Sequence, residues 1–353
     1  MRTFRVATAA AALVFATLVI GSASGGIADD VFTVHDLVAD TAGPAPLTDA
    51  SLVNGWGLSA GPTTPWWVSN NGTNTSTLYS GTGAKIALTV AVPGAPSGTV
   101  YNGSATDFAV SQNGKSGAAK FLFSTEGGTI LGWSPAVNAA TAIPGVDLSS
   151  TGAVFKGLAT MSDRLYATDF HNNRVDVFDS TFTPVTTAPF KDPALPAGYA
   201  PFGIQALAGS IFITYAKQDS AKMDDVAGNG FGYVDQFTPD GALVARVASG
   251  GRKNSPPNAP WGLAIAPSSF GVFSGDLLVG NFGNGRISAY QDRSGKWVFK
   301  GQLRLGDQTL VSIDGLWAIA FGNGAAGGPT TTLYFAAGPG DESHGLFGSI
   351  TAG

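Results

Sequence analysis

The chain has 353 residues, only 12% of them charged, and a formal net charge of −5 at pH 7. Such a composition provides no basic surface for nucleic acid or for an anionic membrane. It contains no cysteine, which excludes disulfide bonds and lipid attachment at a thiol. The 49 glycines instead fit many short strands joined by tight turns, where glycine supplies positive φ angles.

The first segment in chain order has the pattern of an export signal. Two arginines precede an uncharged apolar run, Val6–Ile20, and small residues follow, so we expect cleavage after Ala23 or Ala28. A retained membrane helix is the alternative, but the run is short for a span and no charged stop sequence follows. We therefore predict a signal peptide over residues 1–28 and a secreted or periplasmic protein without a membrane span.

The rest of the chain repeats itself at intervals of roughly 50 residues, which is the period of a four-stranded propeller blade. The opening strands of the repeats are predicted at Trp56–Ala60, Thr106–Val110, Lys156–Thr160, Phe202–Ala206, Trp261–Ile265 and Trp317–Phe321. In the third repeat, the outer strand is predicted at Pro184–Phe190. The pattern predicts an all-β fold, a six-bladed β-propeller that forms a single domain over residues 29–353.

The last repeat is one strand short. After Leu346–Ile350 there is no further strand, whereas Val31–Val38 alternates apolar and polar residues and belongs to no other repeat. We predict that this N-terminal strand pairs with the last blade and closes the ring, which removes an exposed sheet edge.

Two repeats indicate a family. RLYATDFHNNRVDVFD and the stretch Asn258–Gly295 resemble NHL-type propeller repeats. Over nearly the whole mature chain, segments such as YAPFGIQ, TYAKQD and AAGPGDESHGLFGSI resemble an uncharacterised family of exported bacterial propellers. Some members of that family end in a Pro-Glu-Pro sorting tail, which this sequence lacks. The resemblance implies the fold and free secretion or periplasmic residence, but no chemistry, because the family has no established activity.

Two long loops are predicted on the face of the ring where a propeller usually binds ligands. Lys217–Gly230 and Gly338–Gly345 exceed the length that a hairpin needs, and such loops are often functional. Their candidate ligand-binding residues are Lys217, Asp219, Asp341 and Glu342. The alternatives are a solvated acidic surface or a structural calcium ion.

Oxygen-bearing side chains near the same face suggest that any cofactor is Ca²⁺. The candidate metal ligands are Asp224, Asp225, Glu126, Asn70, Asn281 and Asp169. Lactonases of six-bladed architecture hold calcium with Glu, Asn and Asp, and part of this set is similar to theirs. In NHL-type repeats, however, the Asp169 position mainly satisfies backbone groups of a tight turn.

His171 and His344 are the candidate general bases, because each lies in a predicted loop beside a carboxylate. The remaining histidine, His35, falls on the N-terminal strand, which argues against a three-histidine metal centre.

Aromatic residues occupy matching positions where the first strands begin. They are Trp56, Phe202, Trp261 and Trp317, and Lys156 and Thr106 complete the set of six. These rings could form a stacking collar for a sugar or another flat ligand, or they could pack between the blades as core.

No nucleophile elbow, zinc-binding helix or phosphate-binding loop occurs in the sequence. We therefore expect a monomeric binding propeller whose partner is a small molecule, a glycan or a protein, without nucleic acid. A calcium-dependent lactonase, esterase or lyase is the alternative, and a structural envelope protein is a third.

Overall fold

The computed structural model describes residues 31–186, 189–252 and 255–353. The predicted signal peptide lies outside these residues. Within them, no helix is long and apolar enough to cross a membrane.

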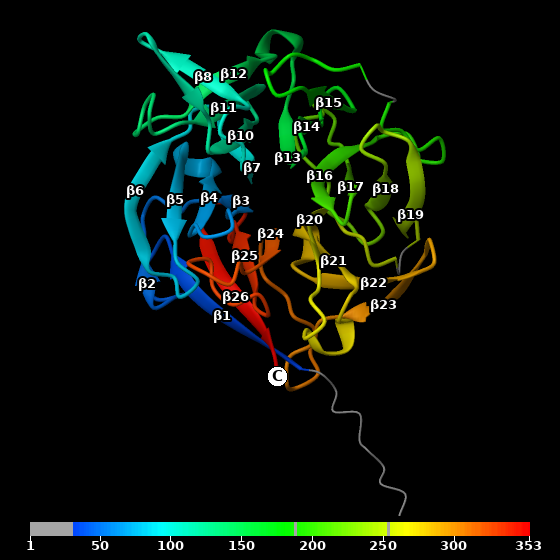
Figure 1. Cartoon of the computed structure of the whole chain (residues 1–353). Coiled ribbons are helices and arrows are strands. Elements are labelled where there is room, and N and C mark those ends of the chain that lie inside the picture. The colour runs from blue at the N-terminus through cyan, green and yellow to red at the C-terminus, as the bar shows by residue number, and fades with distance from the viewer. Residues whose placement is uncertain (1–30, 187–188, 253–254) are drawn as a thin grey trace, which may run out of the picture.

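Six small, mainly antiparallel sheets form a ring, which confirms the predicted six-bladed β-propeller (Figure 1). Blade one contains β3 (Gly55–Ser59), β4 (Trp66–Asn70), β5 (Thr75–Tyr79) and β6 (Lys85–Ala91). Blade two contains β7 (Pro96–Tyr101), β10 (Phe121–Thr125), β11 (Thr129–Trp133) and β12 (Ile143–Asp147). Blade three contains β13 (Phe155–Met161), β14 (Arg164–Asp169) and β15 (Arg174–Phe178). Blade four contains β16 (Tyr199–Leu207), β17 (Ser210–Lys217), β18 (Tyr233–Phe237) and β19 (Leu243–Ser249).

Blade five contains β20 (Pro260–Ile265), β21 (Leu277–Asn281), β22 (Ile287–Arg293) and β23 (Lys296–Gln302). Blade six contains β24 (Leu316–Phe321), β25 (Leu333–Ala337), β26 (Leu346–Ala352), β1 (Phe32–Ala39) and the short β2 (Leu47–Thr48). Single turns of 3-10 helix in the described residues are η1 (Asn71–Thr73), η2 (Ser149–Thr151), η3 (Gly271–Phe273) and η4 (Phe282–Asn284).

The ring is closed by both ends of the described chain, as predicted. Strand β1 runs antiparallel to β26, with Phe32 opposite Ala352 and Ala39 opposite Leu346. Phe32 is 1% exposed, and its ring centroid lies 5.0 Å from that of Phe270 in blade five. The N-terminal strand therefore completes the sheet of blade six and also contributes to the core between blades five and six.

The predicted inner strand of blade two, Thr106–Val110, is wrong. The inner strand is β7, and Thr106 precedes an inserted hairpin formed by β8 (Ala109–Gln112) and β9 (Lys115–Ala118). Strand β7 carries Ser97 at the position where most other blades carry an aromatic residue, so the sequence pattern does not mark it. Ser97, not Thr106, completes the set of six matching positions.

The predicted outer strand of blade three, Pro184–Phe190, includes residues 187 and 188, which lie outside the described residues. In the part that is described, the backbone amide of Val185 donates to the carbonyl of Val177 at 2.8 Å. The chain thus starts to follow β15, but the described residues of this blade form three strands and no fourth.

The inner strands pack tightly around the axis. A Cβ atom added at Gly203 would overlap the carbonyl oxygen of Trp261 in the next blade, and one at Gly57 would overlap the backbone of Ser97. A small cavity of about 20 Å³ lies along the channel, lined by side chains such as Leu158 and Leu263. Side chains of the inner strands therefore reach into the channel, and a ligand at its mouth would meet them there.

Candidate functional site

Lys156 is the centre of a polar cluster at the channel mouth. It lies on the inner strand β13, and its side chain is 1% exposed. Its ammonium donates to Glu126 of the β10–β11 loop and, at 2.9 Å, to Asp224 of the β17–β18 loop. Burial alone would lower the pKa of Lys156, but the two carboxylates outweigh it and raise that pKa. Lys156 thereby joins blades two, three and four through one buried charge.

Amide side chains connect this lysine to blades one and six. The other carboxylate oxygen of Glu126 accepts from Asn71 Nδ2 at 2.8 Å. Asn54 Nδ2 donates to Glu342 Oε2 at 2.5 Å, and Asn54 Oδ1 accepts from the indole of Trp317 at 2.9 Å. The entry loop of β3 and the loops between second and third strands therefore meet on one face. We call the residues of this face the mouth cluster: Asn54, Asn71, Glu126, Lys156, Asp224, Asp225 and Glu342.

Two carboxyl groups of the mouth cluster are perturbed by their surroundings. Burial raises the pKa of Asp225 to about 7, although the nearby charge of Lys156 lowers it. Burial also raises the pKa of Glu342. Asp225 Oδ2 is buried and has no hydrogen-bond partner within the described residues. A carboxyl group that titrates near neutral pH can both accept and donate a proton, which is typical of functional sites.

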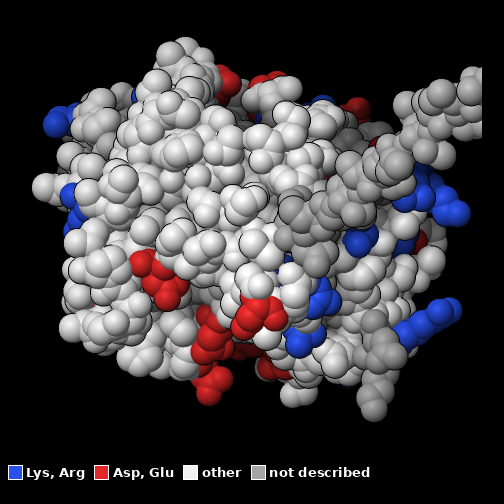
Figure 2. Space-filling view, turned by 90° about the horizontal axis from the view of Figure 1, so that it is seen from below, with Lys and Arg blue, Asp and Glu red and all other residues white. Residues whose placement is uncertain are grey.

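The carboxylates of Asp224 and Glu126 are the solvent-accessible part of the ion pairs in the mouth cluster. The side chain of Asp224 is 72% exposed and that of Glu126 is 23% exposed, whereas Lys156 lies beneath them. In Figure 2, the view from below, most of the visible surface is uncharged, and acidic side chains lie mainly in the lower half of the view, with some along the upper rim.

A floor of aromatic rings lies beneath the mouth cluster. Trp56, Phe202 and Trp317 are each at most 2% exposed, and the centroids of the two indoles are 3.9 Å apart. The Lys156 ammonium lies 5.0 Å from the Trp56 ring centroid, a cation–π contact. Trp261 is half-buried and donates its indole N–H to the carbonyl of Lys156 at 3.1 Å. The structure thus places these rings in the core, and only Trp261 is partly accessible.

Three of the predicted metal ligands end the second strands of their blades and are fully buried there. Asn70 donates to the hydroxyls of two threonines on the adjacent strand, each at 3.0 Å. The carboxylate of Asp169 accepts from the amide of Val154 at 3.2 Å, and Asn281 Oδ1 accepts from the amide of Asn258 at 3.0 Å. These side chains satisfy the turns of three separate blades, and only Glu126, Asp224 and Asp225 of the predicted set share the mouth cluster.

The long loops place the remaining predicted ligand-binding residues in different surroundings. Glu342 belongs to the mouth cluster, whereas Asp341 is exposed. The Lys217 ammonium lies 4.2 Å from the ring centroid of Phe231. The carboxylate of Asp219 accepts from the backbone amide of Met223 at 2.8 Å, so it shapes its own loop.

The two candidate catalytic histidines are separated. His344 Nδ1 lies 2.9 Å from Asp40 Oδ2, just after β1. His171, in the β14–β15 loop, is half-buried, and its Nδ1 is buried without a partner among the described residues. His171 directly follows Phe170, whose ring centroid lies 6.0 Å from the Lys156 ammonium. His344 is also close to the mouth cluster, because it lies two residues after Glu342 and its backbone carbonyl accepts from the amide of Asn54 at 2.9 Å.

The described residues include no group of three His, Cys, Asp or Glu side chains arranged to hold a metal ion. The ammonium of Lys156 lies between two of the carboxylates that a cation would need. A calcium ion at this face stays a prediction from the sequence.

Sequence reasoning included Lys156 among the six matching positions but not among the ligand-binding residues. The signal was present, because a lysine precedes the inner-strand glycine of blade three where blades one, four and five carry an aromatic residue. The sequence also places Asn54 and the segment Ser69–Gly72, which contains Asn71, at the channel mouth, although asparagine is common in turns of this chain.

No family model matches the chain. The chain is 31% identical over 334 residues to uncharacterized protein R648 of Acanthamoeba polyphaga mimivirus, and the match covers 90% of this chain and 79% of R648. It is 30% identical over 319 residues to uncharacterized protein L690 of the same virus, covering 86% and 81%. With R640 it shares 34% identity over 230 residues, which is 64% of this chain and 42% of R640. The chain belongs to the family of these viral proteins, whereas the sequence resemblance led us to expect bacterial relatives.

Solved propellers match the fold at low sequence identity. A protein of unknown function from Bacteroides thetaiotaomicron matches with a TM-score of 0.59 at 12% identity, covering 91% of this chain and 76% of that one. A streptogramin B lyase matches with a TM-score of 0.54 at 12% identity, covering 91% and 98%. A soluble aldose sugar dehydrogenase from Escherichia coli matches with a TM-score of 0.53 at 14% identity, covering 91% and 99%. These likenesses show the propeller fold alone.

Proposed function

We propose that the chain is a binding propeller whose mouth cluster holds a small organic cation, such as an amine. The observation that carries the proposal is the pairing of Lys156 with Glu126 and Asp224 in a setting that also contains Asp225 and Glu342. Loops of blades two, four and six and the inner strand of blade three supply these groups, and such convergence of charged side chains at one mouth is typical of a ligand site.

The charge balance of the mouth cluster favours a cationic ligand. One ammonium, that of Lys156, faces the carboxyl groups of Glu126, Asp224, Asp225 and Glu342. Even with Asp225 partly protonated near pH 7, negative charge remains in excess. The exposed carboxylate of Asp224 is the most accessible partner for an incoming positive charge or hydrogen-bond donor.

Thermal-shift and calorimetric titrations with 1,4-diaminobutane and with myo-inositol, at low ionic strength, test this proposal. We expect the diamine to raise the melting temperature of the wild-type protein, and the Asp224→Asn and Asp225→Asn variants to lose most of that response. Asp240→Asn is the matched control, because Asp240 is an exposed carboxylate that pairs with Arg164 outside the mouth cluster. Binding of the inositol alone would indicate a glycan-type ligand. No response to either, or equal responses of all variants, would contradict the proposal.

The sequence also suggests a calcium ion at this face, and removal of metal tests this prediction separately. Since the Lys156 ammonium already pairs with Glu126 and Asp224, we expect EDTA to leave the melting temperature of the purified protein unchanged. A loss of stability in EDTA that millimolar Ca²⁺ reverses would instead support a bound calcium ion.

A second candidate function is that of a lactonase, esterase or lyase. The specific observation in its favour is the carboxyl group of Asp225, whose pKa of about 7 and free oxygen suit a general acid or base. Turnover of a lactone and aryl-ester panel that Asp225→Asn or His171→Ala abolishes would support this alternative. Inactivity across the panel, with and without Ca²⁺, leaves binding as the better account.

We further propose that the protein is exported and processed near Ala28, on the pattern of residues 1–28. Mass spectrometry of the N-terminus of the protein recovered from the medium or periplasm would test this. An intact leader on cytoplasmic protein would contradict it.

A further inference from the structure

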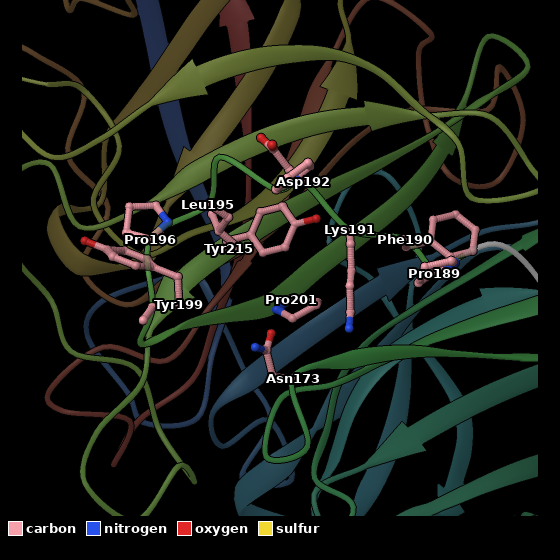
Figure 3. Close-up of a pocket in the computed structure, with 12 residues that line it drawn as sticks. Asn173, Pro189, Phe190, Lys191, Asp192, Leu195, Pro196, Tyr199, Pro201 and Tyr215 are labelled. Atoms are coloured by element: carbon pink, nitrogen blue, oxygen red, sulfur yellow. The ribbon is translucent and has the colours of Figure 1, made fainter.

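A second cavity lies away from the mouth cluster, between blades three and four, and its volume is about 430 Å³ (Figure 3). This volume falls in the range of roughly 300–1,000 Å³ that is usual for small-molecule sites. Most of its wall is apolar or aromatic, formed by Phe190, Leu195, Pro196, Tyr199, Pro201 and Tyr215. We call it the interblade pocket.

One wall of the interblade pocket is a strap, residues 189–198, that crosses from blade three to blade four. Asp192 anchors the strap, since its carboxylate accepts from the guanidinium of Arg246 and, at 2.7 Å, from the amide of Ala194. Arg246 also pairs with Asp235 and lies 4.8 Å from the ring centroid of Tyr233. Prolines within the strap restrict its backbone further. The pocket is therefore preformed, and the negative charge of Asp192 is neutralised inside the protein.

Tyr215 contributes an unused polar group to this wall. Its side chain is 1% exposed, and its hydroxyl has no hydrogen-bond partner within the described residues. Burial raises the pKa of Tyr215 well above its usual range, so the phenol keeps its proton and can donate it. A buried hydroxyl without a hydrogen-bond partner is costly, so an acceptor atom of a ligand within its reach would be stabilising.

One end of the interblade pocket carries a cation, Lys191 of the strap, and an amide, Asn173 of the β14–β15 loop. Figure 3 shows the Lys191 side chain running toward Asn173, with the ring of Tyr215 in the middle of the lining set and its hydroxyl on the Lys191 side. Lys191 is exposed and makes no salt bridge among the described residues, so its ammonium is free to meet an anion. An anion at that end would therefore be attracted, while a ring would lie against the apolar wall.

We infer that the interblade pocket binds a small planar aromatic carboxylate, with an acceptor atom on its ring facing the Tyr215 hydroxyl and its carboxylate facing Lys191 and Asn173. Aromatic and proline side chains favour a flat ring by area and by edge or face contacts. The single positive side chain at the entrance favours an acid over an alcohol or amine. This site is independent of the mouth cluster and of the function proposed for it.

Three related probes separate the two polar contacts: 6-methoxy-2-naphthoate carries both groups, 2-naphthoate lacks the ring acceptor, and 2-methoxynaphthalene lacks the carboxylate. Their fluorescence allows titration of the full-length protein. We expect 6-methoxy-2-naphthoate to bind best. Tyr215→Phe should weaken its binding about 2- to 10-fold, the loss of one neutral hydrogen bond, and leave 2-naphthoate unchanged. Lys191→Gln should weaken both acids by a similar factor and leave 2-methoxynaphthalene unchanged.

Matched controls are Tyr290→Phe, at a buried tyrosine of blade five, and Lys115→Gln, at an exposed lysine of the β8–β9 hairpin. Asp225→Asn should not alter naphthoate binding, which separates this site from the mouth cluster. The Tyr215→Phe protein should melt no lower than the wild type, because the removed hydroxyl has no partner. The inference is overturned if no probe binds at millimolar concentration, if the neutral probe binds as well as the acids, or if the pocket variants behave like their controls.

Discussion

At the scale of single residues, Lys156 shows how one substitution in a repeat changes the chemistry of a ring. Blades one, four, five and six carry aromatic residues at its position. Those of blades one, four and six are buried in the core, and Trp261 of blade five packs against them half-buried. A buried ammonium at the same place requires opposite charges, and the loops of blades two and four provide them through Glu126 and Asp224. The neighbouring carboxyl groups then lie in a partly desolvated, acidic setting, which accounts for the raised pKa of Asp225 and of Glu342.

Asp225 makes the stability of the fold depend on pH. Its pKa in the folded protein is about 7, above the ordinary value of 3.8, so the folded state holds the proton more tightly. The resulting stabilisation is complete below about pH 4 and is lost as the pH rises through 7. We expect Asp225→Asn to reduce the fall in unfolding free energy between pH 5 and pH 8 by about 1–2 kcal/mol, a range discounted for partial exposure.

Urea unfolding of both proteins at the two pH values measures this difference. Asp235, whose pKa is also raised to about 7 by burial, stays in the variant, so the pH dependence should shrink without vanishing. Parallel pH profiles of the two proteins would show that Asp225 titrates at its ordinary pKa.

At the scale of elements, a glycine at one position of each of five inner strands allows neighbouring inner strands to pack closely. In five blades, the residue at the matching position is followed by a glycine that faces the backbone of the next blade. These glycines are Gly57, Gly98, Gly157, Gly203 and Gly262. This repeated close approach brings the backbones of neighbouring inner strands into direct contact. It also explains why the inner strand of blade two follows the same geometry although Ser97 lacks the aromatic signal.

Gly203→Ala should destabilise the protein by about 3 kcal/mol or more, because the new methyl group meets the carbonyl oxygen of Trp261, which cannot move away without shifting a strand. Gly306→Ala is the control, since nothing lies within 4 Å of a Cβ at that position. It should be neutral or slightly stabilising. Equal unfolding midpoints of the two variants in urea would contradict the close packing of blades four and five.

At the scale of the whole molecule, the ring depends on strands from distant parts of the chain. Residues 32–39 pair along β26, and Phe32 packs against blade five. A truncated chain that begins at Thr48 should therefore lose more than the contribution of one strand. Loss of Phe32 alone corresponds to about 3–5 kcal/mol, and β26 becomes an exposed edge that can pair with other chains.

Calorimetry and size-exclusion chromatography measure both effects. We expect a clearly lower melting temperature and association of the truncated protein. A truncated chain that stays monomeric and melts with the full-length protein would show that the ring does not need its N-terminal strand.

The sequence by itself determined the number of blades, the position of most strands and the way the ring closes. These features rest on local, periodic patterns. Apolar residues alternate along the strands, and one strand is left unassigned. An aromatic residue and a glycine open repeats one, four and five, while the third and sixth repeats open with the variants Lys156–Gly157 and Trp317–Ala318. Blade two shows the limit, because Ser97–Gly98 offers too little pattern to be distinguished from a turn.

Only the tertiary structure decided which side chains meet. Lys156 is 30 residues from Glu126 and 68 from Asp224 along the chain. Nothing in this spacing indicates that the buried Lys156 ammonium pairs with both carboxylates. The same holds for Tyr215, whose hydroxyl is left without a partner by the path of the strap between blades three and four. Contacts between blades depend on how the closed ring orients its loops, and a periodic pattern carries no information on that orientation.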